Sequence, residues 1–126
     1  MRTTLSTLHH QTIDWLRELE FYTIEISILA GRLDEVMGKN AGNMETAKLI
    51  RYYENKFLSL REQSDNLSRD IQAREEKVEK TVIEMPDRID EQFRLMDDKL
   101  FDRMALLAKG IASTRLEFNR FLLKVM

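Results

Sequence analysis

The chain has 126 residues, of which 33% are charged and 43% hydrophobic, and its net charge is −2 at neutral pH. This length suits one domain, residues 1–126, and so many charges beside only 4 Gly and 1 Pro are typical of long amphipathic helices. The absence of cysteine excludes disulfides, thiolate zinc sites and cysteine nucleophiles. Both signs of charge are interspersed, so we expect no strong attraction to nucleic acid or to an anionic membrane.

No stretch of the sequence has the features of a targeting signal or a membrane span. Residues 1–11 contain one Arg, three Thr and two His, and they lack the apolar centre of a signal peptide. No apolar run approaches the length of about 18 residues that a transmembrane helix requires. We therefore expect a cytoplasmic protein that does not enter a membrane.

A first helix is predicted over residues 4–37. Its apolar residues alternate between spacings of three and four, which keeps them on one side of a slightly underwound helix. Gly38 is expected to end this helix, because glycine adopts the left-handed conformation at low cost. The stripe consists of Leu8, Thr12, Trp15, Leu19, Tyr22, Ile26, Leu29, Leu33 and Val36.

Two more helices with the same spacing are predicted over residues 43–84 and 86–126. Asn43 suits the N-cap of the earlier one, and Pro86 followed by acidic residues suits the start of the later one. The stripe of the 43–84 helix consists of Ile50, Tyr53, Phe57, Leu60, Ser64, Leu67, Ile71, Arg74 and Val78. The stripe of the 86–126 helix consists of Ile89, Phe93, Met96, Leu100, Arg103, Leu107, Gly110, Thr114, Phe118, Phe121 and Val125.

The order and spacing of these helices predict the fold. Short connections between consecutive helices favour antiparallel neighbours. The predicted fold is therefore all-α, an elongated antiparallel (up-down-up) three-helix bundle of coiled-coil type. Such a bundle resembles the spectrin-type repeat in shape, and no motif in the chain extends this resemblance to function. One alternative is a continuous helix from residue 43 onward, which would complete its core by exchanging helices between chains.

The helix over residues 4–37 has a second apolar face. At about 100° per residue, Phe21, Ile24 and Ile28 fall opposite the main stripe. Three helices cannot bury both faces of one member, so we expect these residues to pack against another chain, most commonly in a two-fold dimer. The simpler interpretation is that they are exposed apolar residues of the kind that every protein surface carries.

The turn between the second and third helices carries further apolar residues. The first helix is shorter than the other two, so it is expected to leave this tip of the bundle uncovered. Val82, Met85 and Ile89 are the candidates for a partner contact there. The function predicted is thus that of a non-enzymatic, self-associating interaction or structural protein, with an unidentified protein as an alternative partner. No catalytic residue and no cofactor are predicted.

One alternative function is metal binding by His9 or His10 together with carboxylates at the same end of the bundle. Adjacent residues on a helix point about 100° apart, so the two histidines do not converge on one ion. Neither follows a glutamate at the Glu-x-x-His spacing of di-metal bundles. We therefore expect a surface histidine pair, in which one ring is able to pair with a carboxylate, and no metal site.

A second alternative is weak nucleic-acid binding at the opposite end. Tyr52, Tyr53 and Lys56 are predicted to lie near the basic end of the third helix, from Lys109 onward, where stacking and phosphate contacts are combined. Glu54 and other nearby acidic residues weaken the positive electrostatic field, so we do not expect nucleic acid as a partner.

Polar residues interrupt the three apolar stripes. In a heptad seam such residues usually set register or oligomeric state at some cost in stability. We expect a structural role for them, with an ion pair from Arg74 or Arg103 to a nearby acidic residue. The set comprises Thr12, Ser64, Arg74, Arg103 and Thr114.

Overall fold

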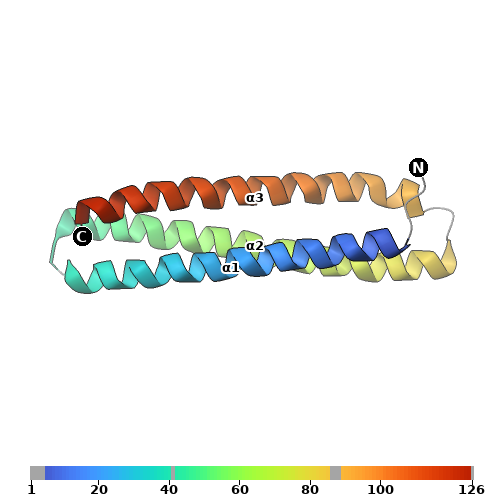
Figure 1. Ribbon diagram of the computed structural model, residues 1–126, viewed down its shortest axis with the longest axis horizontal. Coiled ribbons are helices and arrows are strands. Elements are labelled where there is room, and N and C mark those ends of the chain that lie inside the picture. Colours follow the sequence, from blue (N-terminus) through green and yellow to red (C-terminus); the bar gives the residue numbers. More distant parts are fainter. Residues whose placement is uncertain (1–4, 41, 86–88, 126) are drawn as a thin grey trace.

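The computed structural model describes residues 5–40, 42–85 and 89–125. They form three helices, α1 (Leu5–Lys39), α2 (Met44–Glu84) and α3 (Ile89–Val125), and contain no strand. The helices lie side by side and alternate in direction along the molecule (Figure 1). The all-α, up-down-up three-helix bundle is therefore confirmed. The alternative of one continuous helix from residue 43 onward is wrong, because α2 and α3 pack against each other.

The end of α1 differs from the prediction. Gly38 lies inside the helix, which continues to Lys39, and its backbone is not left-handed. Asn40 closes the last turn instead, because its backbone N–H and its side-chain amide each donate to the Val36 carbonyl at 3.0 Å. The left-handed conformation falls at Gly42, where φ is 93°.

The start of α2 follows the prediction. The side chain of Asn43 accepts a hydrogen bond from the Thr46 N–H at 3.1 Å, which satisfies a backbone donor that has no partner within the helix. At the other end, the Met85 N–H donates to the Thr81 carbonyl at 2.7 Å. Pro86, the predicted first residue of the third helix, lies outside the described residues.

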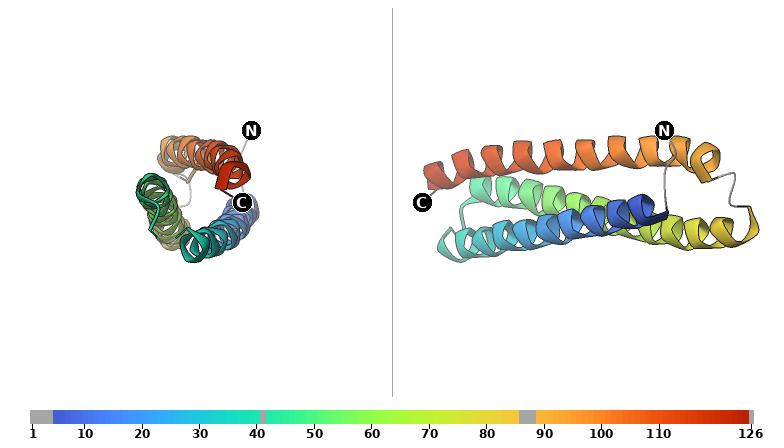
Figure 2. Two further views of the ribbon diagram at one scale, coloured as in Figure 1. Left: turned by 90° about the vertical axis from the view of Figure 1, so that its left-hand side faces the viewer. Right: turned by 45° about the vertical axis from the view of Figure 1, so that its right-hand side comes forward.

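The three helices surround an apolar interior that runs along the molecule (Figure 2). It consists of one large cluster and a smaller one, formed by Leu8, Val78 and Phe93, near the connection between α2 and α3. In α1 and α2 the buried residues follow the predicted stripes closely. In α3 the buried face is shifted near its middle, where Met104 and Ile111 are buried while Arg103 and Gly110 are only half-buried. A helix that packs against two neighbours needs a wider apolar stripe than a strict heptad seam provides, which explains the shift.

Aromatic rings fill the core toward the end where α1 and α2 connect. The ring of Tyr53 lies 5.1 Å from that of Phe118 and 5.0 Å from that of Phe121. Phe57 meets Phe118 edge-on at 5.2 Å. Edge-to-face pairs of this kind add about 0.5–1.5 kcal/mol beyond the burial of their area, so this end of the bundle is firmly packed.

Candidate functional site

Three large apolar side chains lie on consecutive turns on the outer face of α1. Phe21, Ile24 and Ile28 are 63%, 54% and 59% exposed, whereas Leu19 and Ile26 on the opposite side of the same helix are buried. Their spacing of three and then four residues places them in one row. We call this row the outer face of α1, and it is the surface that the sequence predicts as an interface.

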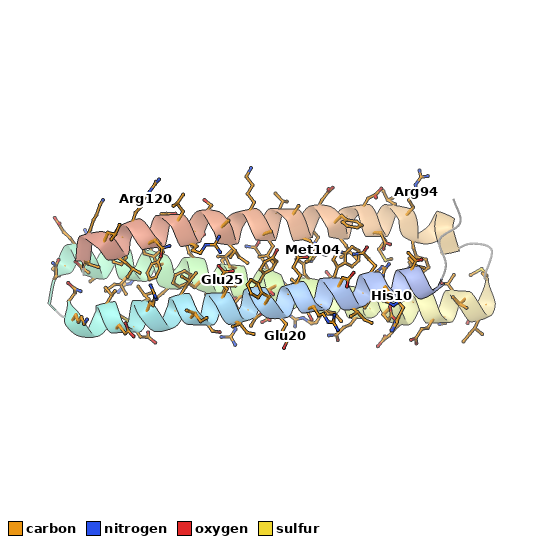
Figure 3. All side chains as sticks on the ribbon, viewed as in Figure 1. His10, Glu20, Glu25, Arg94, Met104 and Arg120 are labelled. Atoms are coloured by element: carbon orange, nitrogen blue, oxygen red, sulfur yellow. The ribbon has the colours of Figure 1, made fainter. Side chains whose placement is uncertain are left out.

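Charged residues surround the outer face of α1. Arg17 and Glu20 precede the apolar row, Arg32 and Glu35 follow it, and all four are exposed. Glu20 points away from the bundle (Figure 3). An apolar centre with a charged, solvated rim is the usual anatomy of a protein interaction surface.

Other exposed apolar residues lie on α3, and the sequence analysis missed them. They are half or more exposed but do not form a row, because none of them is three or four residues from the next. The set comprises Leu95, Phe101, Leu106, Leu116 and Leu123. The heptad stripe predicts only the buried side of this helix, and these residues lie outside it. Single exposed leucines are common on protein surfaces and do not mark a site.

The tip of the bundle near the α2–α3 connection is less open than predicted. Val78 and Phe93 are buried there, because Leu8 of α1 reaches far enough to pack against both. Val82 is half-buried against this cluster, and Met85 is 42% exposed. The side chain of Ile89 lies outside the described residues. Of the predicted tip residues, Met85 and part of Val82 are thus open to solvent, and Ile83, which was not predicted, is 83% exposed beside them.

Arg74 of α2 lies at the centre of a buried polar cluster that joins all three helices. Its side chain is 0% exposed, and its Nε and Nη2 donate to the two carboxylate oxygens of Asp97 on α3 at 2.6 and 2.9 Å. Its Nη1 donates to the Leu8 carbonyl at 3.2 Å and to the Thr12 hydroxyl at 2.7 Å, both on α1. The guanidinium carbon lies 5.1 Å from the centre of the Trp15 ring.

Glu75 extends the cluster toward the surface. One of its oxygens accepts from the Thr12 hydroxyl at 2.6 Å, and the other lies 2.5 Å from Nδ1 of His9. Burial alone would raise the pKa of Glu75, but the hydrogen bonds from Thr12 and His9 and the charges of His9 and Arg74 outweigh it, so the pKa lies below its ordinary value. The cluster is fully satisfied, since every buried side-chain nitrogen and oxygen of the described residues has a partner.

The arrangement around the histidines gives no support to the metal alternative. One histidine does pair with a carboxylate, because Nδ1 of His9 lies 2.5 Å from a carboxylate oxygen of Glu75. The His9 and His10 rings are 6.5 Å apart and tilted by 54°, so they do not share a direction. Among the described residues, no group of three or more His, Asp or Glu side chains is arranged to hold a metal ion.

At the opposite end, two of the basic residues have neighbours of their own, whereas Arg120 points away from the bundle (Figure 3). Lys56 lies over the Tyr52 ring at 5.8 Å, and Arg115 of α3 is bonded to Glu25 of α1. Tyr53, which was considered for base stacking, is buried in the aromatic core. These contacts reduce the cationic and aromatic surface that a nucleic acid needs.

No protein family, curated protein or solved structure matches this chain. Within the described ranges, no helix combines the length and the apolar character that crossing a bilayer requires. The candidate surface therefore has to be interpreted from its own chemistry.

Proposed function

We propose that this chain is a non-enzymatic interaction protein that self-associates through the outer face of α1. The observation that carries the proposal is the exposure of Phe21, Ile24 and Ile28 in one row on two turns of a single helix. A second copy of the chain covers this row by placing its own α1 against it. A two-fold axis lets the same surface serve both partners, so a dimer is the expected assembly.

The driving force is the removal of these side chains from water. Full burial of a Phe or Ile side chain contributes about 1.5–3 kcal/mol, and each copy supplies three that are more than half exposed. The interface is narrow, because one helix from each copy forms most of it. We therefore expect a reversible dimer that dissociates at micromolar concentrations and not an obligate one.

Light scattering on a sizing column over a range of concentrations tests the proposal. The wild-type chain is expected to approach twice its monomer mass as the concentration rises. Replacing Phe21 and Ile24 together by Glu places two charges in the centre of the interface, so this variant should remain monomeric at every concentration. Its helical circular dichroism should be unchanged, because neither side chain belongs to the core.

A matched control separates a local effect from a general change in surface charge. Leu106 and Leu116 on α3 are 69% and 55% exposed, and replacing both by Glu adds the same charge away from α1. This control is expected to dimerise like the wild type. A wild-type chain that stays monomeric at high concentration, or a control that dissociates as readily as the Phe21 and Ile24 variant, would overturn the proposal.

A further inference from the structure

The outer face of α1 continues on both sides as a second heptad stripe. Its members alternate between spacings of four and three residues, as the core stripe of the same helix does, and all are exposed. The stripe has a basic residue at one end, an acidic residue at the other and its bulkiest apolar side chains between them. From the N-terminal end it consists of Arg17, Phe21, Ile24, Ile28, Gly31 and Glu35.

Gly31 has no explanation inside the bundle. Glycine in the middle of a helix is about 0.5–1 kcal/mol less favourable than alanine. A Cβ added at Gly31 would meet nothing within 4 Å, and the backbone there is not left-handed. Neither core packing nor backbone geometry therefore requires a glycine. A residue without a side chain on an outer face leaves room for a bulky group that approaches from outside.

We infer that two copies pair their α1 helices antiparallel, with the two-fold axis level with Ile26. This inference rests on the proposed self-association and adds its direction and register. Antiparallel heptad stripes face one another in layers, so fixing the axis fixes every facing pair, and the symmetry makes each pair occur twice. The facing pairs are Phe21 with the partner's Gly31, Ile24 with the partner's Ile28, and Arg17 with the partner's Glu35.

In the facing pairs of this register the side chains complement each other in size and in charge. The largest side chain of the stripe, Phe21, meets the smallest, and opposite charges meet at both ends of the apolar centre. On one edge of the helix pair, Glu18 comes beside the partner's Arg32, which adds another pair of opposite charges. On the same edge Glu25 comes beside the partner's Glu25, and each of these carboxylates is bonded to Arg115 of its own chain. On the other edge Glu20 approaches the partner's Asp34, and this repulsion opposes the favourable pairs.

The competing arrangements match less well. A parallel pair would place Arg17 against the partner's Arg17 and Glu35 against the partner's Glu35, and like charges destabilise such contacts. An antiparallel pair shifted by one heptad would place Arg17 against the partner's Ile28. It would also bring Glu18 beside the partner's Glu25. A shift of one heptad in the other direction would make attractive edge pairs, but it would place Ile24 against the partner's Glu35 and leave Arg17 opposite no residue of the partner's α1. The pairing of Arg17 with Glu35 at both ends of the stripe therefore favours the register centred on Ile26.

Cysteine cross-linking tests the register directly, because the chain contains no cysteine of its own. The variants Ile24→Cys and Ile28→Cys are mixed in equal amounts in a glutathione redox buffer. A disulfide requires the two Cβ atoms to lie about 3.5–4.5 Å apart, so facing positions cross-link preferentially. We expect the mixed disulfide to exceed its statistical share of one half of the covalent dimers. A parallel pair would instead give each variant linked to itself.

A second mixture distinguishes the shifted antiparallel register. It combines Phe21→Cys with Ile24→Cys. These positions face each other only if the two helices are shifted by one heptad, which moves the axis by half a heptad along α1. This mixture is expected to show no excess of the mixed disulfide. An excess here, with none between Ile24→Cys and Ile28→Cys, would overturn the inferred register while leaving self-association intact.

Charge reversal provides a measurement that introduces no cysteine. Arg17→Glu and Glu35→Arg should each raise the dimer dissociation constant about tenfold, since each turns two attractive pairs into repulsive ones. The double variant restores both pairs and should return close to the wild-type value. Arg94→Glu is the control, because Arg94 on α3 points away from the bundle (Figure 3). A double variant whose dissociation constant is raised by the product of the two single effects would contradict the register.

The experiments distinguish a failure of the proposed self-association from a failure of the inferred register. A wild-type chain that is monomeric by light scattering would overturn both the proposed function and the register. A dimer that Phe21→Glu with Ile24→Glu dissociates, but whose cross-links and charge variants follow another pattern, would overturn the register alone.

Discussion

The fully buried Arg74 shows how one residue decides the arrangement of three helices. Removing a guanidinium from water is unfavourable unless its donors are satisfied, and here Asp97 on α3 and two groups on α1 accept from it. A slip of either neighbouring helix by one turn would leave the charge without these partners. Arg74 therefore fixes the register of the bundle at the end where the N-terminal part of α1 lies.

We predict that Arg74→Ala destabilises the fold by about 3–5 kcal/mol, because it leaves the Asp97 carboxylate and the polar groups of α1 without their partner. Arg103→Ala is the control. That arginine bonds Asp70 at 2.7 Å, but the two side chains are 42% and 54% exposed, so its loss should cost only about 0–1 kcal/mol. Urea denaturation followed by circular dichroism measures both variants.

Replacing both charged partners by apolar residues separates the destabilisation caused by an unpaired buried charge from the net contribution of the ion pair to stability. Replacing Arg74 by Met and Asp97 by Leu together should recover most of the stability that Arg74→Ala loses, because no unpaired charge remains buried. If the double variant is as unstable as Arg74→Ala, the cluster contributes to stability through more than the pairing of its charges.

The sequence predicted part of the buried polar cluster around Arg74. The heptad stripe placed Arg74 in the core, because its position was fixed by the apolar residues around it. The spacing could not identify Asp97 as its partner, since that depends on the axial position of α3 relative to α2. The spacing also placed Arg103 in the core, whereas the wider buried face of α3 turns this side chain toward Asp70.

At the scale of elements, the connection between α1 and α2 shows the limits of reading helix ends from glycines. Two glycines flank this connection, and the sequence alone favoured the earlier one as the helix stop. The structure continues α1 past Gly38, because Asn40 can satisfy the Val36 carbonyl from both its backbone and its side chain. The left-handed position falls at Gly42, immediately before the N-cap of α2.

This assignment gives opposite predictions for two substitutions of the same kind. Gly42→Ala should destabilise the fold by about 1 kcal/mol, because a side chain is strained at a φ of 93°. Gly38→Ala should stabilise it by about 0.5–1 kcal/mol, because the backbone there is helical and nothing lies within 4 Å of the added Cβ. Thermal unfolding of both variants tests the assignment, and a reversed order of melting temperatures would contradict it.

The helices themselves were predictable to within a few residues at the ends that the structure describes. Long periodic stripes determine where a helix lies, since each apolar position must reach the same core. The outer face of α1 was predictable for the same reason, because Phe21, Ile24 and Ile28 break the expected polar side of the helix. The cover that Leu8 gives to Phe93 was not predictable, because it depends on how far α1 extends along the other two helices.

At the scale of the whole molecule, α1 lies unevenly along the bundle, and this unevenness determines the shape of the proposed dimer. Ile26 and Phe57 line the same groove between α1 and α2, so the inferred two-fold axis passes near the level of Phe57. From there α2 extends for about 20 Å toward its start and about 40 Å toward its end, at 1.5 Å per residue. The axis is therefore far from the middle of the bundle.

An antiparallel dimer about this axis must be longer than one bundle and shorter than two. The long arms of the two copies point in opposite directions, so the helical part of the dimer should span about 80 Å, compared with about 60 Å for one α2 helix. Small-angle X-ray scattering at concentrations on either side of the dissociation constant measures this change in maximum dimension. A parallel dimer of fully overlapping bundles would keep the length near 60 Å while its cross-section grew, and an end-to-end dimer would approach 120 Å. An increase of roughly one third, absent in the variant with Phe21 and Ile24 replaced by Glu, is the result that agrees with pairing through the outer face of α1.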